Sequence, residues 1–290
     1  MYLNIKKIKK KNNKLKIGLK RDIIDKFYTH PKIAQLCIDK FKNIIKLNKN
    51  DIIIEPSAGD GSFIEVIKQL SKNYRFYDIK PENNQIIKQD FLKLDSSKIF
   101  SKFNKIHVIG NPPFGRQSSL VFKFIKKASL FADSISFILP KSFKKDSMKT
   151  KMPLNFHLIY QKDLPLNSFL INNIPHDVPC VFQIWIKKNK ERKPPLKLQP
   201  YGYKFVKKTE DPQLAVRRIG INAGKIFTEI TNKSVTSHYF LKFNKKEHPQ
   251  KFIIEASKVK FKHDNTVGPR SISKPELINI YNGIFKRLQK

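Results

Sequence analysis

The chain has 290 residues, of which 40% are hydrophobic, so it can bury a sizeable core and form one large domain with a smaller companion. Its formal net charge of +36 at pH 7 favours a polyanionic partner, with nucleic acid first, although a coding bias toward Lys, Asn and Ile would also place lysines on solvated faces. Two cysteines exclude a disulfide framework or a cysteine-built zinc site, and no apolar run is long enough to span a membrane.

These properties predict an intracellular protein, located in the bacterial cytoplasm or, if viral, in the host cell. The N-terminus has a basic run without a following apolar core and cleavage site, so we do not expect secretion. We also expect no membrane contact and no metal ion. The sequence carries no indication of the oligomeric state.

Residues 1–20 contain eight lysines and no acidic residue. Such a composition predicts a basic, flexible arm that orders when it meets a polyanion. A solvated leader without a role is the alternative interpretation of this arm.

The chain after residue 26 alternates between helical and extended patterns. Pro31 suits a first helical position, and apolar residues at helical spacing follow it. A short apolar run at residues 51–55 precedes two glycines and then an apolar-periodic segment, which predicts a strand, a glycine turn and a helix. Further strands are expected at 75–78, 106–109 and 135–139, with a helix over 118–131. This alternation predicts a doubly wound, mostly parallel α/β sheet.

The order loosens beyond Pro140. Two more strand-like runs at 156–161 and 181–187, separated by a polar loop, are expected to form an edge hairpin of the same sheet. The basic, proline-containing stretch 187–200 is typical of a linker. We therefore predict a basic arm over 1–20, a catalytic domain over 21–190, and a smaller C-terminal α+β region over 201–290.

The glycine turn is a candidate cofactor site. Gly59 and Gly61 lie where a strand turns into a helix, so the backbone can approach a ligand closely. The nicotinamide fingerprint would need a third glycine at the position of Ile64, and no Walker phosphate loop is present. The acids Glu55 and Asp60 beside the turn suit a positively charged ligand, and S-adenosylmethionine carries both an ammonium and a sulfonium.

Two more acidic residues follow at positions suited to a nucleoside. Asp78 ends the next strand, where an acid reaches the ribose hydroxyls of a bound nucleoside. Asp90 could accept from the adenine amino group of the cofactor, and Phe91 could offer a ring edge to its base. A surface acid at a strand end is the alternative for Asp78.

The segment Asn111-Pro112-Pro113-Phe114 follows the strand at 106–109 and lies at its carboxyl end, where open α/β sheets bind ligands. An amide oxygen and a proline carbonyl can accept both hydrogens of an exocyclic amine. Holding these hydrogens out of the ring plane favours the pyramidal nitrogen that attacks a methyl group. The Phe114 ring offers a flat face on which a base can stack. The motif therefore predicts amino methylation.

These motifs resemble those of class I S-adenosylmethionine-dependent amino-methyltransferases, particularly the adenine-N6 DNA methyltransferases. The segments 55–61 and 111–114 are similar to the cofactor and catalytic motifs of this family, and the motif order resembles its gamma arrangement, with a C-terminal target-recognition region. The resemblance covers roughly residues 26–187 and implies a Rossmann-like, seven-stranded sheet. It implies base contact by Asn111, Pro112, Pro113 and Phe114, and cofactor contact by Phe27, Tyr28, Thr29, Glu55, Pro56, Ala58, Gly59, Gly61, Asp78, Asp90 and Phe91.

The predicted reaction is methyl transfer to adenine N6, with DNA preferred to RNA as the substrate. Two alternatives stay open: an RNA enzyme that modifies adenine N6, including cap-adjacent adenosine, or guanine N2, and an inactive nucleic-acid-binding module. Cys180 begins an apolar run, so we expect a buried strand residue and not the nucleophile of a cytosine-C5 enzyme. Phe169, Asn172 and His176 are expected to border the base pocket. The residues expected to contact nucleic acid are Arg116, Lys141, Arg217, Arg218 and Lys225.

Overall fold

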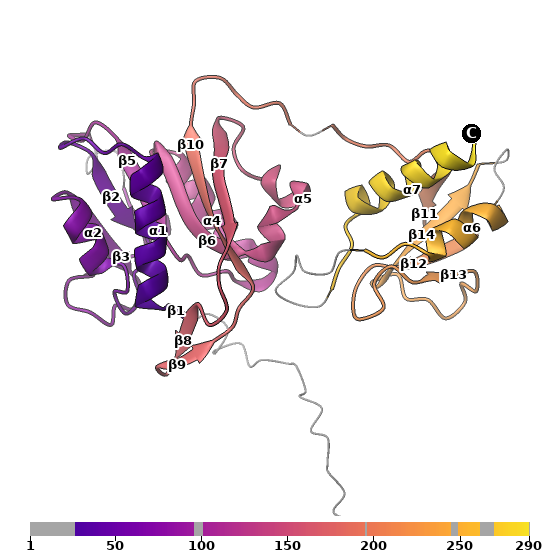
Figure 1. Ribbon diagram of the computed structural model, residues 1–290, viewed down its shortest axis with the longest axis horizontal. Helices are drawn as coiled ribbons and strands as arrows, with labels where there is room; N and C mark the ends of the chain where they lie inside the picture. The colour runs from indigo at the N-terminus through magenta and orange to yellow at the C-terminus, as the bar shows by residue number, and fades with distance from the viewer. Residues whose placement is uncertain (1–26, 96–100, 195, 245–248, 262–269, 290) are drawn as a thin grey trace, which may run out of the picture.

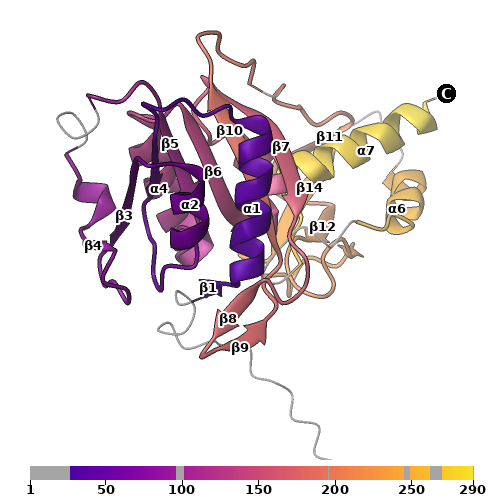
Figure 2. The ribbon, with the colours of Figure 1, turned by 60° about the vertical axis from the view of Figure 1, so that its left-hand side comes forward.

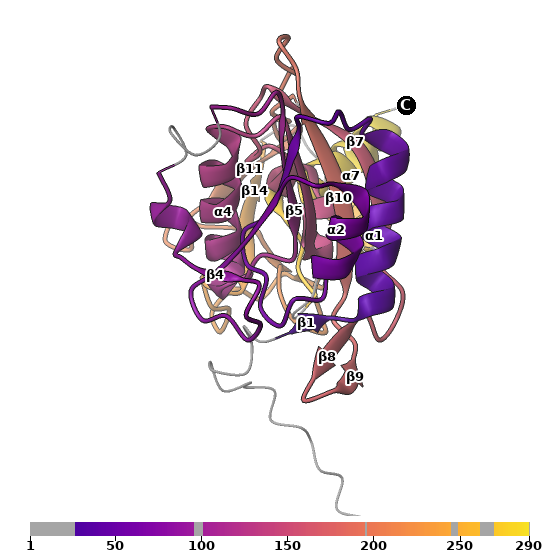
Figure 3. The same cartoon turned by 90° about the vertical axis from the view of Figure 1, so that its left-hand side faces the viewer.

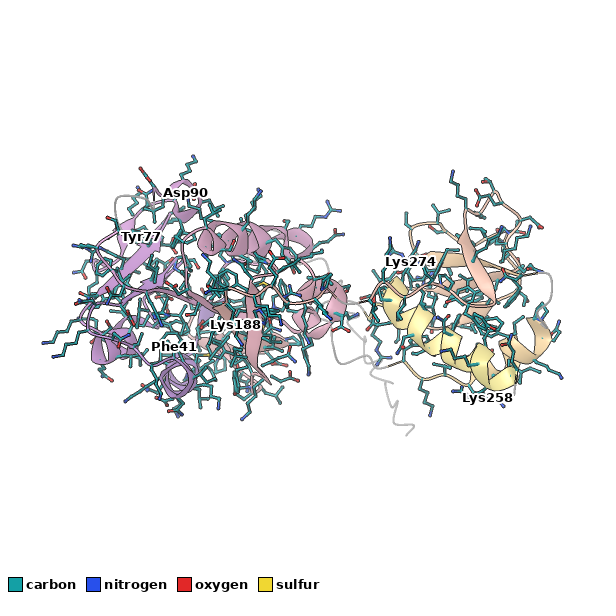
Figure 4. The ribbon with its side chains drawn as sticks, turned by 90° about the horizontal axis from the view of Figure 1, so that it is seen from above. Phe41, Tyr77, Asp90, Lys188, Lys258 and Lys274 are labelled. Atoms are coloured by element: carbon teal, nitrogen blue, oxygen red, sulfur yellow. The ribbon has the colours of Figure 1, made fainter. Side chains whose placement is uncertain are left out.

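The computed structural model describes residues 27–95, 101–194, 196–244, 249–261 and 270–289 (Figure 1). The predicted basic arm, residues 1–20, lies outside the described residues. Within them the chain forms a seven-stranded sheet, a four-stranded sheet and a small three-stranded sheet. The seven-stranded sheet and the four-stranded sheet lie in separate parts of the molecule, at either end of its long axis (Figures 1 and 4).

The seven-stranded sheet has the strand order β4-β3-β2-β5-β6-β10-β7. The first five strands of this order run parallel, and β10 is antiparallel to both of its neighbours. The predicted mostly parallel sheet and its antiparallel edge pair are therefore confirmed. The strands are β2 (Ile52–Glu55), β3 (Tyr74–Asp78), β4 (Ile87–Lys88), β5 (Ile106–Gly110), β6 (Ser134–Pro140), β7 (Phe156–Asp163) and β10 (Cys180–Lys187).

Helices cover both faces of this sheet, as a doubly wound fold requires (Figure 3). The helices α1 (Pro31–Ile44) and α2 (Ile64–Leu70) pack in one apolar core, and α4 (Ser119–Ser129) packs in another. Every residue of the central strand β2 is buried, because the strand lies between these two cores. Short helical turns lie in the connections: η1 (Phe91–Lys93), η2 (Arg116–Ser118), η3 (Lys141–Lys144) and α5 (Asp146–Lys149).

The segment between β7 and β10 is a β-hairpin, so the prediction of a polar loop in this segment was wrong. Strands β8 (Phe169–Ile171) and β9 (Ile174–His176) pair antiparallel across Asn172 and Asn173, which have φ angles of 49° and 63°. Asparagine tolerates this left-handed conformation, which a two-residue hairpin turn requires. Strand β8 also pairs with β1 (Tyr28–Thr29), so the hairpin fixes a segment far away in the sequence (Figure 2).

The C-terminal region has the predicted α+β character. Its antiparallel sheet has the order β11-β14-β12-β13, and one face packs against α6 (Pro249–Ser257) and α7 (Lys274–Leu288) around a core rich in aromatic rings. Helix α7 begins with a capping box, in which Ser273 and Glu276 satisfy each other's backbone N–H groups. The strands are β11 (Tyr203–Val206), β12 (Leu214–Arg217), β13 (Ile226–Phe227) and β14 (His238–Phe243).

The two large sheets fall on either side of the predicted boundary between residues 190 and 201, and this division into domains stays a prediction. The segment that connects the two sheets first packs against the part of the chain that carries the seven-stranded sheet. The guanidinium of Arg192 donates to the carbonyl oxygens of Phe156, Lys149 and Met152 at 3.0, 2.9 and 2.6 Å, and it also lies over the Trp185 ring. Beyond this anchor the chain crosses to the second region (Figure 1).

Replacing Arg192 by alanine should destabilise the first domain by about 2–3 kcal/mol, because three carbonyl groups lose a charged donor. The measurement is the free energy of unfolding from urea titration. The substitution Arg192→Lys should recover only part of the loss, since one ammonium cannot reproduce the planar fork. Equal stability of Arg192→Ala and the wild type would contradict the anchoring role.

Candidate active site

The carboxyl ends of β2, β3 and β5 meet around a cavity of about 440 Å³. Parallel pairing puts the segments that follow these strands at one edge of the sheet, although they lie far apart in the sequence. The cavity lining includes all but one of the residues predicted to contact the base or the cofactor: Phe27, Tyr28, Thr29, Glu55, Pro56, Ala58, Gly59, Asp78, Asp90, Phe91, Asn111, Pro112, Pro113 and Phe114.

The exception is Gly61, which is not part of the lining. Its φ angle is +94°, and a Cβ at this position would lie 2.7 Å from the Ile64 Cδ1 atom, so it shapes the turn into α2. Gly59 has a φ angle of +56°, and its backbone N–H donates to Asp78 Oδ2 at 2.9 Å. The second Asp78 oxygen accepts from the Lys80 N–H at 2.8 Å. The glycine turn and the end of β3 are therefore held as one unit.

Glu55 is the buried acid of the site. Its side chain is 2% exposed, and its Oε2 atom has no hydrogen-bond partner among the described residues. Burial raises the pKa of this carboxyl well above its ordinary value, and the negative charges of Asp60 and Asp78 add to the effect. A cationic ligand in the cavity would reverse this balance and favour the carboxylate.

Tyr28 and Glu82 join across one side of the cavity, and the sequence did not indicate Glu82. The Tyr28 hydroxyl donates to Glu82 Oε1 at 2.6 Å, while the Glu82 N–H donates to the Gly59 carbonyl oxygen at 3.1 Å. The pairing of β1 with β8 brings Tyr28 to this position. No local pattern could have indicated such a contact.

Asn111 lies directly after Gly110, the last residue of β5. Its Nδ2 atom donates to the Phe27 carbonyl oxygen at 3.2 Å, which fixes which end of the amide is the nitrogen. The buried Oδ1 atom has no hydrogen-bond partner within the described ranges. Ser57 of the glycine turn donates to the Asn111 carbonyl oxygen at 3.3 Å and so links the two motifs. The site therefore holds an oriented and unused acceptor.

Phe114 is held by the start of α4. Its carbonyl oxygen accepts the N–H groups of Leu120 and Val121 at 3.2 and 3.4 Å, as a cap for that helix. Leu120 and Phe124, one helical turn apart on α4, also line the cavity. Neither residue was expected from the sequence, although helical spacing after residue 118 could have indicated them.

The expected nucleic-acid contacts fall into two groups. Arg116 is exposed directly after the Phe114 segment, while Lys141 forms an ion pair with Asp163 at 3.1 Å. In the second region the backbone N–H of Arg217 donates to the Lys225 carbonyl oxygen at 2.8 Å, so the backbones of the three expected residues are neighbours. Arg218, the third of them, stacks over the Tyr239 ring at 5.7 Å.

Of the hairpin residues expected to border the base pocket, Phe169 is fully buried and is not part of the cavity lining. Its ring packs edge-on against Phe27 in the core, because β8 pairs with β1. Asn172 forms the hairpin turn, and His176 stacks on Phe27. Cys180 is 2% exposed in β10, which confirms the expected buried strand residue.

The described ranges hold no group of three or more His, Cys, Asp or Glu side chains placed to bind a metal ion. Among the helices of the same residues, none is long and apolar enough to cross a bilayer.

Known proteins share part of this sequence, although no family model matches the chain. The ribosomal RNA small subunit methyltransferase A of Francisella tularensis subsp. novicida is 30% identical over 118 residues, which cover 36% of this chain and 45% of that protein. The same protein from Francisella tularensis subsp. tularensis matches equally well, at 30% identity over 118 residues. The chain thus spans about half the length of the curated relatives that it matches.

Solved structures of methyltransferases are also similar. A proposed RNA methyltransferase from Pyrococcus horikoshii has a TM-score of 0.46 at 14% identity. The matched part is 59% of this chain and 90% of the Pyrococcus chain. A type I restriction-modification methyltransferase subunit from Streptococcus thermophilus has a TM-score of 0.43 at 16% identity. The matched part is 57% of this chain and 45% of the Streptococcus chain. The strand order β4-β3-β2-β5-β6-β10-β7, with β10 antiparallel, is that of a doubly wound, mostly parallel sheet. The seven-stranded sheet and its helices have the predicted Rossmann-like α/β fold.

The burial of Glu55 predicts a pH-dependent cost to stability. The folded protein binds the proton of the Glu55 carboxyl more tightly than the unfolded chain does. The stability that this bound proton contributes is therefore lost as the pH rises above 4.5, the ordinary pKa of a glutamate. Glu55→Gln should therefore raise the melting temperature near neutral pH without ligand, and the gain should shrink toward pH 4.5. Thermal unfolding across this range tests the prediction, with the more exposed Glu65→Gln as the matched control. A gain independent of pH would contradict it.

Proposed function

We propose that this protein transfers a methyl group from S-adenosylmethionine to the exocyclic amino group of a nucleic-acid base, with adenine N6 first. The observation that carries the proposal is the orientation of Asn111. Its amide nitrogen is engaged by the Phe27 carbonyl, so Oδ1 is the acceptor left for an amine. The adjacent prolines have no N–H groups and leave their carbonyl oxygens as further acceptors.

The residues of the cavity fit S-adenosylmethionine. The Glu55 carboxyl, whose Oε2 atom has no hydrogen-bond partner among the described residues, and the side chain of Asp60 suit the cationic methionine part. Gly59 lets the backbone approach closely. Asp78, at the end of β3, would reach the ribose hydroxyls. Asp90 and the Phe91 ring would hold the adenine. The cofactor would supply the methyl group: its S–CH3 bond would break as the N–CH3 bond forms, the neutral thioether would leave, and the methylated amine would release one proton to solvent.

The chain's own groups activate the amine. The lone pair of a base amino group is delocalised into the ring, which makes the amine a poor nucleophile. Asn111 Oδ1 and the Pro112 carbonyl oxygen would accept its two hydrogens and favour the pyramidal form that can attack. Both acceptors are fixed before the substrate binds, so little reorganisation is needed in the transition state. The Phe114 ring would stack on the base, a contact that contributes ~1–3 kcal/mol.

DNA and RNA are both candidates for the substrate. The resemblance in motif order favours DNA, with the C-terminal region as the recognition element. The matched relatives are named for ribosomal RNA, and this observation favours RNA as a second candidate. The net charge of +36 suits either polymer. A nucleic-acid-binding module without activity would retain the charge but would have no use for an oriented amide beside a cofactor cavity.

The proposed reaction is tested with labelled S-adenosylmethionine and four substrates: double-stranded DNA, single-stranded DNA, uncapped RNA and capped RNA. Nuclease digestion then identifies the modified base. We expect label on N6 of adenine. The absence of transfer to every substrate, together with failure to bind S-adenosylmethionine in calorimetry, would reject the enzyme.

Asn111→Ala should lower the rate of methyl transfer by about 10²–10³-fold, because the variant loses an acceptor aligned with the reacting amine. Binding of S-adenosylmethionine, measured by calorimetry, should be largely preserved. Asn84→Ala, at an exposed position outside the cavity lining, serves as the control and should transfer at the wild-type rate. Unchanged activity of Asn111→Ala would remove the proposed clamp.

The cations of the second region should strengthen binding by neutralising phosphates. Replacing Arg217, Arg218 and Lys225 by glutamine should reduce the slope of log affinity against log salt by roughly 0.7–0.9 for each phosphate that is no longer neutralised. The control variant replaces the exposed Lys42, Lys126 and Lys188 by glutamine and so removes the same charge from the part of the chain that carries the seven-stranded sheet. An equal change in both variants would mean that the net charge, and not this cluster, binds the polymer.

A further inference from the structure

We propose that His176, on the hairpin β8–β9, is a positioning residue for Asn111 and acts through Phe27. The proposal rests on the proposed function, because it concerns the amide that would accept the hydrogens of the target amine. It assigns a role in the reaction to a hairpin that lies outside the parallel strands and their loops (Figure 2).

The Asn111 amide has two possible orientations. An asparagine amide can exchange its oxygen and nitrogen by rotation, with little change of shape. The Phe27 carbonyl oxygen accepts from Nδ2 at 3.2 Å and so selects the rotamer with Oδ1 as the free acceptor. In the opposite rotamer two donors would face the hydrogens of the substrate amine. The position of the Phe27 carbonyl therefore decides whether the amide can bind the amine.

Phe27 is itself held by the hairpin. Strand pairing fixes Tyr28 and Thr29, which lie opposite Leu170 and Phe169. Phe27 precedes the first of these paired residues. Its ring is held by side chains of the hairpin, with His176 stacked at a centroid distance of 5.4 Å and an interplanar angle of 24°. Phe169 completes the contact from the core side, edge-on at 6.2 Å.

The hairpin and its flanks carry neither lysine nor arginine. Residues 164–180 contain no Lys or Arg, in a chain that has 59 of them. The hairpin is therefore a poor phosphate-binding surface, although exposed apolar side chains such as Ile174 lie on it. His176 is exposed, and its ring lies against Phe27. These features favour a role of His176 in positioning the site residues over a direct contact with the phosphate groups of the nucleic acid.

The test compares three variants in the same transfer assay. His176→Ala should lower kcat by about tenfold or more, because a small displacement of a positioning contact is costly at a reacting centre. The KM values for S-adenosylmethionine and for the nucleic acid should stay close to those of the wild type. His176→Phe should restore kcat, since a planar ring can stack on Phe27 in the same way. Ile174→Ala is the control on the same strand and should leave kcat unchanged.

A measurement without substrate separates this proposal from the proposed function. In nuclear magnetic resonance spectra of ¹⁵N-labelled protein, the Asn111 side-chain amide is identified by its loss in Asn111→Ala. Its hydrogen exchange should be faster in His176→Ala and return to the wild-type rate in His176→Phe. This result supports the positioning role even if no nucleic acid is methylated, in which case only the proposed function fails.

Three outcomes would overturn the proposal. Unchanged exchange of the Asn111 amide in His176→Ala would show that the hairpin does not hold it. A rise in the KM for nucleic acid without a change in kcat would make His176 a substrate contact. A failure of His176→Phe to restore either kcat or the exchange rate would mean that stacking on Phe27 is not the cause.

Discussion

The parallel pairing of β2 with β3 and β5 is the constraint on which the site depends. Ile54 lies opposite both Arg75 and Val108, so the three strands end at the same edge of the sheet. The backbone after each strand can then carry one part of the site: the glycine turn, Asp78 and Asn111. A shift of one residue in any strand would turn its last side chains to the other face of the sheet.

The site keeps polar atoms that the folded chain does not satisfy. Glu55 Oε2 and Asn111 Oδ1 are buried, and neither has a hydrogen-bond partner among the described residues. Burying such atoms without partners costs free energy, and proteins rarely retain the cost without a use for it. Here a cationic cofactor and a base amine would each supply the missing partner. The two atoms thus mark the two halves of the proposed reaction.

Local sequence patterns were sufficient to predict a residue's role wherever that role depends only on residues close to it in the chain. The prolines at the first position of α1 and after Asn111 restrict the backbone angle φ, and the glycines after β2 permit a positive φ, whatever surrounds them. The hairpin β8–β9 was missed because its partner, β1, lies more than a hundred residues away and is only two residues long. Glu82 was missed for the same reason, since its contact with Tyr28 depends on that pairing.

Hydrophobic periodicity and residues with special backbone preferences act locally, so the alternation of strands and helices, the two motifs and the kind of chemistry they favour could be predicted from the sequence. Only the tertiary structure decided which end of the Asn111 amide is free, since the Phe27 carbonyl that selects it is 84 residues away. It also decided that Glu55 is buried among acids and that Phe169 belongs to the core and not to the pocket. Burial and hydrogen-bond partners are properties of the packed chain, and no local pattern contains them.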